Sequence, residues 1–323
     1  MHRFPIVMLL LVSCAAERGG DPTTATTTDA ESSTSAGTST TTGSSTAPTP
    51  TSSSDTTATD STGGAPACNG RADACLLRLD EVLLPATHNS IASAAYGFPA
   101  LNRNQEHGLR RQLDDGIRGL LLDVTEYEGG TWLCHGPCSL AKLAHLDAIA
   151  EIGEFLDEHP REVIVIIYED TAGAGAIEAD WQASGHEGKL IELDGTGFPT
   201  LGELVDAGTR VLVTAENGGP PPAWFHHAWD TVWDTPYTFH ALDELSCAMN
   251  RGTPGVGLYL VNHWISTDLD LPDESSAAAA NASDVLSARL EACTAQWQHP
   301  VNLLAVDFYE QGDLFAVVDA HAP

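Results

Sequence analysis

Basic residues are scarce in this chain. Of its 323 residues only 14 are Lys or Arg, against 45 Asp or Glu, so the formal net charge is −31. Proteins that bind nucleic acid neutralise its phosphates with clusters of Lys and Arg, whereas a strongly acidic chain repels them. The composition therefore excludes nucleic acid as a partner.

Long apolar runs are also missing beyond the first residues. A helix that spans a bilayer needs roughly 20 consecutive apolar residues, and no later segment approaches that length. We therefore expect the globular part of the protein to be soluble. Large apolar side chains are absent from about residue 20 to residue 64 as well. Such a segment cannot bury enough surface to offset the entropy of ordering it, so we predict a disordered Ser/Thr-rich linker over residues 15–67.

The N-terminus has the pattern of an export signal, because a charged start is followed by a short apolar stretch over residues 4–12. Leu11-Val12-Ser13-Cys14 resembles the bacterial lipobox, in which the Cys is acylated and becomes the mature N-terminus. We predict that residues 1–14 are a lipoprotein signal peptide and that acylated Cys14 holds the protein at a membrane of the cell envelope. The alternative is an ordinary signal peptide cut near Ala15-Ala16, which would give a secreted protein.

The chain has seven Cys, and acylation of Cys14 leaves six. Because an export signal implies an oxidising compartment, we predict three disulfides. The expected pairs are Cys68–Cys75, Cys134–Cys138 and Cys247–Cys293. A zinc site at Cys134, His135 and Cys138 is the competing interpretation, but no second Cys/His pair at finger spacing is present.

Residues 68–323 contain short apolar runs separated by segments of helical periodicity. Strands are predicted at residues 82–86, 117–124, 131–134, 163–168, 210–214, 257–261 and 302–308, and the clearest helix at residues 140–158. Buried strands alternating with helices indicate a parallel sheet, and their number favours a closed or nearly closed (β/α) barrel. A doubly wound open sheet is the alternative, which the absence of a Gly-rich dinucleotide fingerprint weakens.

Polar residues follow several predicted strands, and the chemistry of a parallel barrel occurs at that end of its strands. They are His88, Asn89, Asp123, His135, Glu169 and Asp307. Two His without a third soft ligand suit a general base and a general acid in phosphoryl transfer better than a zinc site.

The oxygens of Asn89, Asp123 and Glu169 form a hard ligand set that suits Ca²⁺. Asp170 is adjacent to Glu169, so only one of the two points inward from a strand, and we choose Glu169. In so acidic a chain the substrate phosphate needs a bound cation or a local positive charge, for which we nominate Arg118.

An aromatic stretch from Trp224 to Tyr237 has two interpretations. It forms either a packed loop with buried indoles, which we prefer, or a lipid- or sugar-facing rim at the mouth of the barrel.

Together these motifs resemble the X domain of phosphatidylinositol-specific phospholipases C, and especially its secreted branch of PLC-like phosphodiesterases. The resemblance covers roughly residues 82–320. It rests on the ordered set THNS at 87–90, NQE at 104–106, GIRGLLLD at 116–123, WLCH at 132–135, IYED at 167–170 and LAVDFY at 304–309.

The resemblance implies a distorted (β/α)8 TIM barrel over residues 68–323, with His88 as general base and His135 as general acid. It also implies that Asp307 orients His88. In calcium-dependent members the equivalents of Asn89, Asp123 and Glu169 bind the cation, but a further Glu on the second strand is replaced here by Leu121. Metal-independent bacterial members have an Arg at the position of Asp123, so the resemblance favours the calcium-assisted mechanism.

Two functions are therefore expected. The first is an exported phosphodiesterase that cleaves a phospholipid or another phosphodiester through a cyclic phosphate. The alternative, motivated by Leu121, is a non-catalytic surface lipoprotein that binds a lipid head group or a carbohydrate on a retained barrel.

Overall fold

The computed structural model describes residues 67–323. The predicted signal peptide, Cys14 and nearly all of the predicted linker lie outside the described residues. Within them, no helix combines the length and the apolar character needed to cross a membrane.

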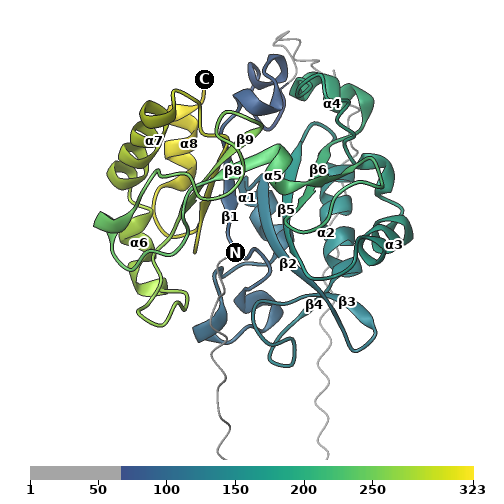
Figure 1. Cartoon of the computed structure of the whole chain (residues 1–323), viewed down its shortest axis with the longest axis horizontal. Coiled ribbons are helices and arrows are strands. Elements are labelled where there is room, and N and C mark those ends of the chain that lie inside the picture. Colours follow the sequence, from purple (N-terminus) through teal and green to yellow (C-terminus); the bar gives the residue numbers. More distant parts are fainter. Residues whose placement is uncertain (1–66) are drawn as a thin grey trace, which may run out of the picture. The chain divides into compact units, whose positions relative to one another are not determined.

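A curled sheet of parallel strands forms the centre of the molecule (Figure 1). Its strands are β1 Leu84–Thr87, β2 Gly119–Tyr127, β5 Ile164–Asp170, β6 Val211–Ala215, β7 Phe225–His227, β8 Val232–Asp234, β9 Leu258–His263 and β10 Leu303–Val306. They pair side by side in the order β7-β6-β5-β2-β1-β10-β9-β8. No pairing joins β7 to β8 within the described part of the chain, so the barrel is open there. The predicted distorted TIM barrel is thus confirmed.

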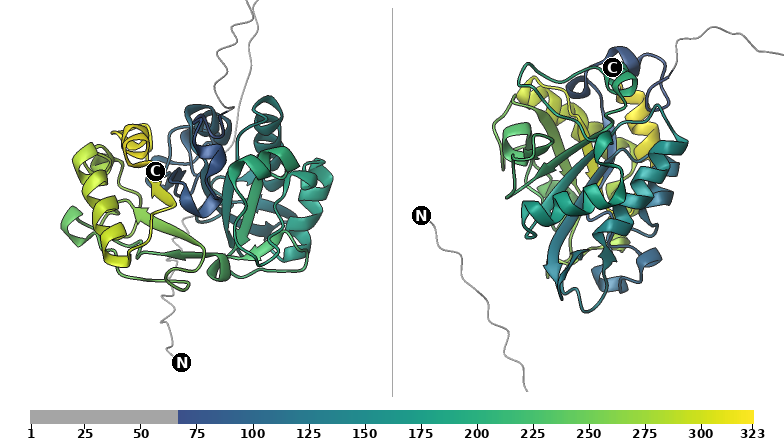
Figure 2. Two further views of the ribbon diagram at one scale, coloured as in Figure 1. Left: turned by 90° about the horizontal axis from the view of Figure 1, so that it is seen from above. Right: turned by 90° about the vertical axis from the view of Figure 1, so that its right-hand side faces the viewer.

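Helices surround this sheet on the outside, as Figure 2 shows. They are α1 Leu109–Asp115, α2 His145–Glu158, α3 Ala174–Ser184, α4 Leu201–Ala207, α5 Ala228–Thr231, α6 Glu274–Ala280, α7 Ser283–Trp297 and α8 Leu314–His321. Helix α2 buries one apolar face, which includes Ile149, Ile152 and Phe155. It begins five residues later than expected, because Leu143–Ala144 form the short strand β4.

Side chains alternate along each strand between two cores, as the two-residue period of a strand requires. One core lies between the sheet and the helices and contains Leu122, Tyr168 and Val213. The other fills the inside of the barrel and contains Ala86, Ile167 and Leu303, with Leu121 packed against it. This interior is tight: a Cβ on Gly119 would lie 2.6 Å from the Cβ of Ala86. Continuing the alternation from Leu121 and Ile167 places Asp123 and Glu169 on the inner face.

The segment at residues 131–134 is not a barrel strand, which corrects the prediction. Strand β3, Gly130–Leu133, runs antiparallel to β2 and pairs with β4 on its other side. The two-residue turn between β2 and β3 is Glu128-Gly129, and both residues have positive φ, 50° and 80°. This is the backbone conformation that the tightest hairpins prefer.

Two short strands, β7 and β8, were not predicted and fall within the aromatic stretch. Trp224, Phe225 and Trp233 are buried, as the packed-loop interpretation expects. The residues nonetheless form two strands of three residues each, joined by α5. Segments this short carry too little alternation to be recognised as strands.

All three predicted disulfides are present: Cys68–Cys75, Cys134–Cys138 and Cys247–Cys293. The competing zinc site is excluded, because Cys134 and Cys138 bind each other. The long-range pair joins the loop between β8 and β9 to helix α7.

Candidate active site

Two adjoining hollows open at the carboxyl ends of the barrel strands. Their volumes are about 200 and 360 Å³. Both are lined by His88, Asn89, Asp123, Glu169, Tyr237 and Trp264, and the larger one also by His135. Because they share these six residues, we call the two together the hollow. The structure thus brings together both predicted catalytic histidines and all three predicted ligands of the cation.

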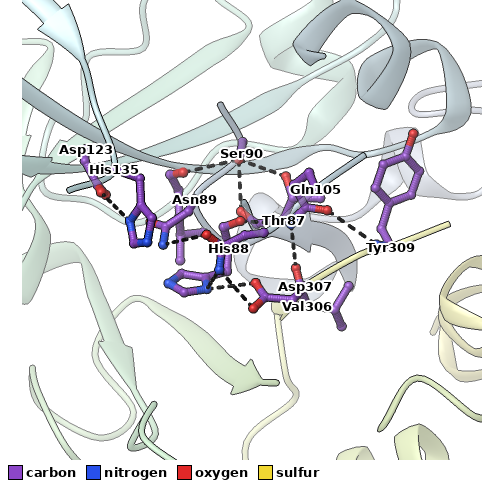
Figure 3. Close-up of polar contacts among 12 residues, drawn as sticks. Thr87, His88, Asn89, Ser90, Gln105, Asp123, His135, Val306, Asp307 and Tyr309 are labelled. Atoms are coloured by element: carbon purple, nitrogen blue, oxygen red, sulfur yellow. Dashed lines mark hydrogen bonds and ion pairs between the residues drawn. The ribbon is translucent and has the colours of Figure 1, made fainter. Parts of the chain in front are cut away.

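His88 is held beside Asp307 because their strands are paired in register. Thr87 of β1 lies opposite Val306 of β10, so the next residue of each strand follows at the same level. The Nδ1 of His88 lies 2.9 Å from Oδ1 of Asp307 (Figure 3). A carboxylate only accepts hydrogen bonds, so Nδ1 donates and Nε2 is left as the acceptor in the neutral ring. This is the tautomer that a general base requires.

Further contacts fix the orientation of this pair. Asn104 donates from Nδ2 to the other carboxylate oxygen of Asp307 at 2.9 Å. The imidazole of His88 stacks on Trp264 with ring centroids 3.7 Å apart and planes 5° from parallel. Gln105 donates to the main-chain carbonyls of His88 and Val306. The roles of Asn104 and Trp264 were not predicted, although Asn104 belongs to one of the quoted motifs.

His135 reaches the site through the β2–β3 hairpin rather than from the end of a parallel strand. The antiparallel register places Leu133 opposite Val124, and Cys134 donates from its backbone N–H to the carbonyl of Asp123. Nδ1 of His135 then lies 3.2 Å from Oδ2 of Asp123. The Cys134–Cys138 disulfide closes the loop, and the side-chain amide of Asn102 donates to the carbonyl of His135. Each histidine therefore has a carboxylate on Nδ1.

Asn89 adopts a left-handed backbone conformation with φ of 43°, which Asn tolerates better than most residues. Its side chain is buried, and its Nδ2 donates to Oδ1 of Asn104 at 3.3 Å. The amide oxygen has no hydrogen-bond partner within residues 67–323, so it is available to a ligand in the hollow.

Asp123 and Glu169 are register partners on the neighbouring strands β2 and β5. The pKa of Glu169 is raised, first by desolvation and then by the negative charge of Asp123. Within the described residues Glu169 has no hydrogen-bond or ion-pair partner, which is the situation expected where a cation belongs. Two carboxylates and the amide of Asn89 fit the oxygen preference of Ca²⁺. These three residues provide few protein ligands for a metal ion. In residues 67–323 no group of three or more His, Cys, Asp or Glu is arranged to hold one.

Asp170 does not belong to the hollow. Its side chain is buried and accepts a hydrogen bond from the backbone N–H of Asn217 at 2.7 Å. Desolvation raises its pKa. Of the two adjacent carboxylates, Glu169 is the one that lines the hollow, in agreement with the choice made from the sequence.

Arg118 is not in the site, and its nomination as the phosphate-neutralising residue was wrong. It precedes the first residue of β2 and so lies at the amino end of the strands, whereas the site lies at the carboxyl end. Its Nε donates to Glu162 at 2.7 Å, and its Nη1 donates to the carbonyls of Leu113 and Ile117. Its guanidinium also lies 5.0 Å from the centroid of the Phe155 ring, so it stabilises the amino end of the barrel.

The positively charged side chain that does line the hollow is that of Arg251, which was not predicted from the sequence. Its Nη1 donates to Glu216 at 2.8 Å, and its Nε and Nη2 donate to Asp234 at 3.1 and 2.6 Å. Its guanidinium lies over the rings of Trp229 and Tyr237, 4.2 and 4.8 Å from their centroids. Glu216 directly follows β6, so the strand-end rule would have found it, whereas Asp234 ends β8, which is too short to be recognised from the sequence. Arg251 lies in a long loop and has no such signal.

The family model described as PI-PLC X 1 matches residues 75–321. The chain belongs to this PI-PLC X family. Two curated relatives are similar to it: an uncharacterized secreted protein of Arthroderma benhamiae, 26% identical over 278 residues, and a PI-PLC X domain-containing protein of Arabidopsis thaliana, 24% identical over 258 residues. These alignments cover 76% and 72% of this chain, which spans about three fifths of either relative, 61% and 60%.

Solved structures agree with the fold of this PI-PLC X chain. Phosphatidylinositol-specific phospholipase C from Listeria monocytogenes superimposes with a TM-score of 0.55 at 15% identity, covering 76% of this chain and 95% of that one. A mutant of the phosphatidylinositol-specific phospholipase C from Staphylococcus aureus gives a TM-score of 0.55 at 12% identity, covering 76% and 94%. At these identities the similarity shows the fold alone.

Proposed function

We propose that this protein is a phosphodiesterase that cleaves a phosphodiester carrying a neighbouring hydroxyl, with an inositol phospholipid as the expected substrate. The observation that carries the proposal is the presence of two histidines on one hollow, each with a carboxylate on Nδ1. In this proposal His88 is the general base and His135 the general acid, the two roles that phosphoryl transfer to an internal hydroxyl needs. Membership of the PI-PLC X family supports the same class of reaction.

In the proposed mechanism the two rings transfer protons in opposite directions. Nε2 of His88 removes the proton from the substrate hydroxyl, whose oxygen attacks phosphorus and forms the new P–O bond. The P–O bond to the leaving alkoxide breaks, and protonated His135 donates its Nε2 proton to that oxygen. The products are a cyclic phosphate and an alcohol, for example a diacylglycerol. Solvent exchange, or hydrolysis of the cyclic phosphate with the two roles reversed, restores both histidines.

Asp307 and Asp123 each assist one of the two histidines in this mechanism. Asp307 stabilises the imidazolium that forms when His88 takes the proton. Asp123 keeps His135 oriented by accepting a hydrogen bond from its Nδ1. Each carboxylate thus holds one ring in place, because the hydrogen bond on Nδ1 leaves Nε2 for the proton transfer.

We also propose that the site uses Ca²⁺, held by Asn89, Asp123 and Glu169. When bound, the cation would supply positive charge that offsets the charge on the phosphate. This need is strong here, because Asp123 and Glu169 would otherwise repel an anionic substrate, and Arg251 is already paired with two carboxylates.

Export is proposed for the whole chain. The three disulfides support an oxidising compartment, and one relative is named a secreted protein. Anchoring through acylated Cys14 remains a proposal from the sequence. Radiolabelled fatty acid should attach to the wild-type chain and not to Cys14→Ser, and labelling of that variant would reject the lipobox.

The decisive test is an assay of the exported protein on phosphatidylinositol, with Ca²⁺ and with excess chelator. His88→Ala should abolish turnover, while His159→Ala, at an exposed position outside the hollow, should leave it unchanged. No turnover of any inositol lipid or glycerophosphodiester would reject the proposal.

A non-catalytic surface protein that binds a lipid head group or a carbohydrate is the second candidate. Leu121, where calcium-dependent members have a Glu, is the observation that favours it. Calorimetric binding of inositol phosphate without any product after long incubation would support binding over catalysis.

A further inference from the structure

One buried side chain contacts both parts of the site, the general base and the ligands proposed for the cation. It belongs to Asn104, which lies in the loop between β1 and α1 and is 1% exposed. Its side chain touches His88 and Asn89, which line the hollow. Its backbone is also fixed, because its N–H donates to the carbonyl of Ala92 and its carbonyl accepts from the N–H of Phe308, each at 2.7 Å. Asn104 therefore meets the site from behind, through its side-chain amide.

Asp307 determines which way this amide points. A side-chain amide has a donor end and an acceptor end, whereas a carboxylate only accepts. The end of Asn104 that lies 2.9 Å from Oδ2 of Asp307 is therefore its Nδ2. The same nitrogen lies 3.3 Å from Nδ1 of His88. Because Nδ1 already donates its proton to Oδ1 of Asp307, these two donors do not bond each other. His88 and Asn104 thus occupy the two oxygens of one carboxylate.

The orientation of Asn104 in turn determines that of Asn89. With its nitrogen on Asp307, Asn104 presents Oδ1 to Asn89, whose Nδ2 donates to it at 3.3 Å. The oxygen of Asn89 is then turned the other way, and Asn89 lines the hollow. Reversal of the Asn104 amide would set an oxygen against a carboxylate and two NH₂ groups against each other. One arrangement of the two amides is therefore allowed.

This orientation matters more for an amide ligand than for a carboxylate. Asp123 and Glu169 present an oxygen to a cation whichever way they are turned. Asn89 does so in one of its two orientations, and in the other it presents NH₂, which a cation repels. A ligand that is held in its binding orientation before the ion arrives binds it more tightly.

We propose that Asn104 is a positioning residue that holds the amide oxygen of Asn89 toward the cation, with its own amide oriented by Asp307. The general base and the amide ligand then depend on the same buried carboxylate. The inference rests on the proposed function, because it takes Asn89 as a ligand of Ca²⁺. It gives a role to a side chain that touches neither the ion nor the substrate.

The test is calorimetric titration of the exported protein with Ca²⁺, without substrate. Asn104→Leu keeps the size and removes both ends of the amide, so it should weaken Ca²⁺ binding about 10-fold or more. Unchanged affinity in the folded variant would overturn the inference.

Asn302→Leu is the matched control. Asn302 is also 1% exposed, and its amide also donates one hydrogen bond and accepts another, with Val82 and Tyr259. It precedes β10 and so lies at the amino end of the barrel, away from the hollow. Its replacement should leave Ca²⁺ affinity unchanged, and an equal loss in both variants would overturn the inference.

A second background separates positioning from general loosening. In Asn89→Asp both ends of the side chain are oxygens, so its orientation no longer matters. Asn104→Leu should then cause no loss of Ca²⁺ affinity, whereas a loss of the same size as in the wild-type background would indicate a merely structural role and overturn the inference.

If Asn104→Leu does not fold, Asp307→Asn takes its place in the same comparison. Its effect on Ca²⁺ affinity should be at least about threefold larger with Asn89 than with Asn89→Asp, because the part due to charge alone is common to both. Equal effects would overturn the inference.

Failure of this inference is distinguishable from failure of the proposed function, because the titration needs no turnover. If phosphatidylinositol is not cleaved but the variants bind Ca²⁺ as expected, catalysis is rejected and the positioning role stands. If phosphatidylinositol is cleaved but wild type binds no Ca²⁺, the inference is overturned and the roles of the two histidines stand.

Discussion

Asp307 accepts a hydrogen bond from Nδ1 of His88 at 2.9 Å, although 219 residues separate the two in the chain. The contact exists because β1 and β10 are adjacent and in register, so the residues that follow them emerge together. Asp307 is almost fully buried and His88 is partly open to the hollow. The carboxylate therefore acts on the substrate only through the imidazole.

Replacement of Asp307 tests this positioning role. In Asp307→Asn the amide no longer stabilises the imidazolium, so kcat should fall about 100-fold or more. The pH profile of kcat should change as well, because the substitution removes a negative charge beside the imidazole. Asp319→Asn, at an exposed position on α8, is the control. A reduced rate with an unchanged pH profile would indicate a merely structural role.

Loss of His135 should be partly compensated by a better leaving group. His135→Ala should slow cleavage of phosphatidylinositol by about 10²- to 10⁴-fold, because the departing alkoxide then leaves unprotonated. A nitrophenyl ester of inositol phosphate has an acidic leaving group, and the loss should be much smaller for it. Kinetics on both substrates check this, and an equal loss on both would exclude His135 as the general acid.

Calcium dependence follows from the ligand set. Excess chelator should abolish activity and Ca²⁺ should restore it with weak apparent affinity. Leu121→Glu adds a carboxylate to the inner face of β2 and should tighten Ca²⁺ binding about 10-fold, while Asp123→Asn should weaken it. Leu140→Glu, on an exposed loop, controls for added charge.

Calorimetric titration with Ca²⁺ gives a readout independent of activity. Full activity in excess chelator would refute the metal assignment.

Glu216 should make the stability of the fold depend on pH. Burial is the main cause that raises its pKa from 4.5 to about 7, against the lowering effect of Arg251. The folded protein therefore holds a proton that the unfolded chain releases, and this contribution to stability is complete below about pH 4.5. It is lost as the pH rises to about 7. Urea unfolding across this range should show the decline in wild type and a flatter curve in Glu216→Gln, and parallel curves would contradict the prediction.

The disulfides should differ in their contribution to stability. Cys247 and Cys293 are 46 residues apart, whereas Cys68 and Cys75 are 7 apart. Loop-closure entropy then predicts a loss of about 4 kcal/mol on replacing the first pair by Ala and about 2 kcal/mol for the second. Only removal of the Cys247–Cys293 disulfide should also raise KM, because Cys247 anchors the loop that carries Arg251 at the hollow. Denaturant unfolding and kinetics on both variants check the ranking, and equal losses would reject it.

Most of the catalytic pairings expected from the sequence rest on one local rule. Apolar runs show where strands end, and parallel strands end at the same edge, so His88, Asp123, Glu169 and Asp307 were predicted to meet. The disulfides were likewise recognisable, because two of the pairs are close in sequence. The rule also placed His135 correctly, although β3 is not one of the parallel strands. It is the second strand of an antiparallel hairpin with β2, and this hairpin brings His135 next to Asp123.

The sequence by itself determined the family, the barrel and the two histidines, because these depend on local patterns repeated along the chain. Only the tertiary structure decided which arginine lines the hollow. Arg118 stands in the GIRGLLLD segment beside a strand, but it precedes that strand and so lies at the opposite end of the barrel. Arg251 lies in a loop without any pattern, and only the packing of Asp234, Glu216 and two aromatic rings around it brings its charge into the hollow. Contacts of this kind depend on how distant segments pack, which no local spacing in the chain encodes.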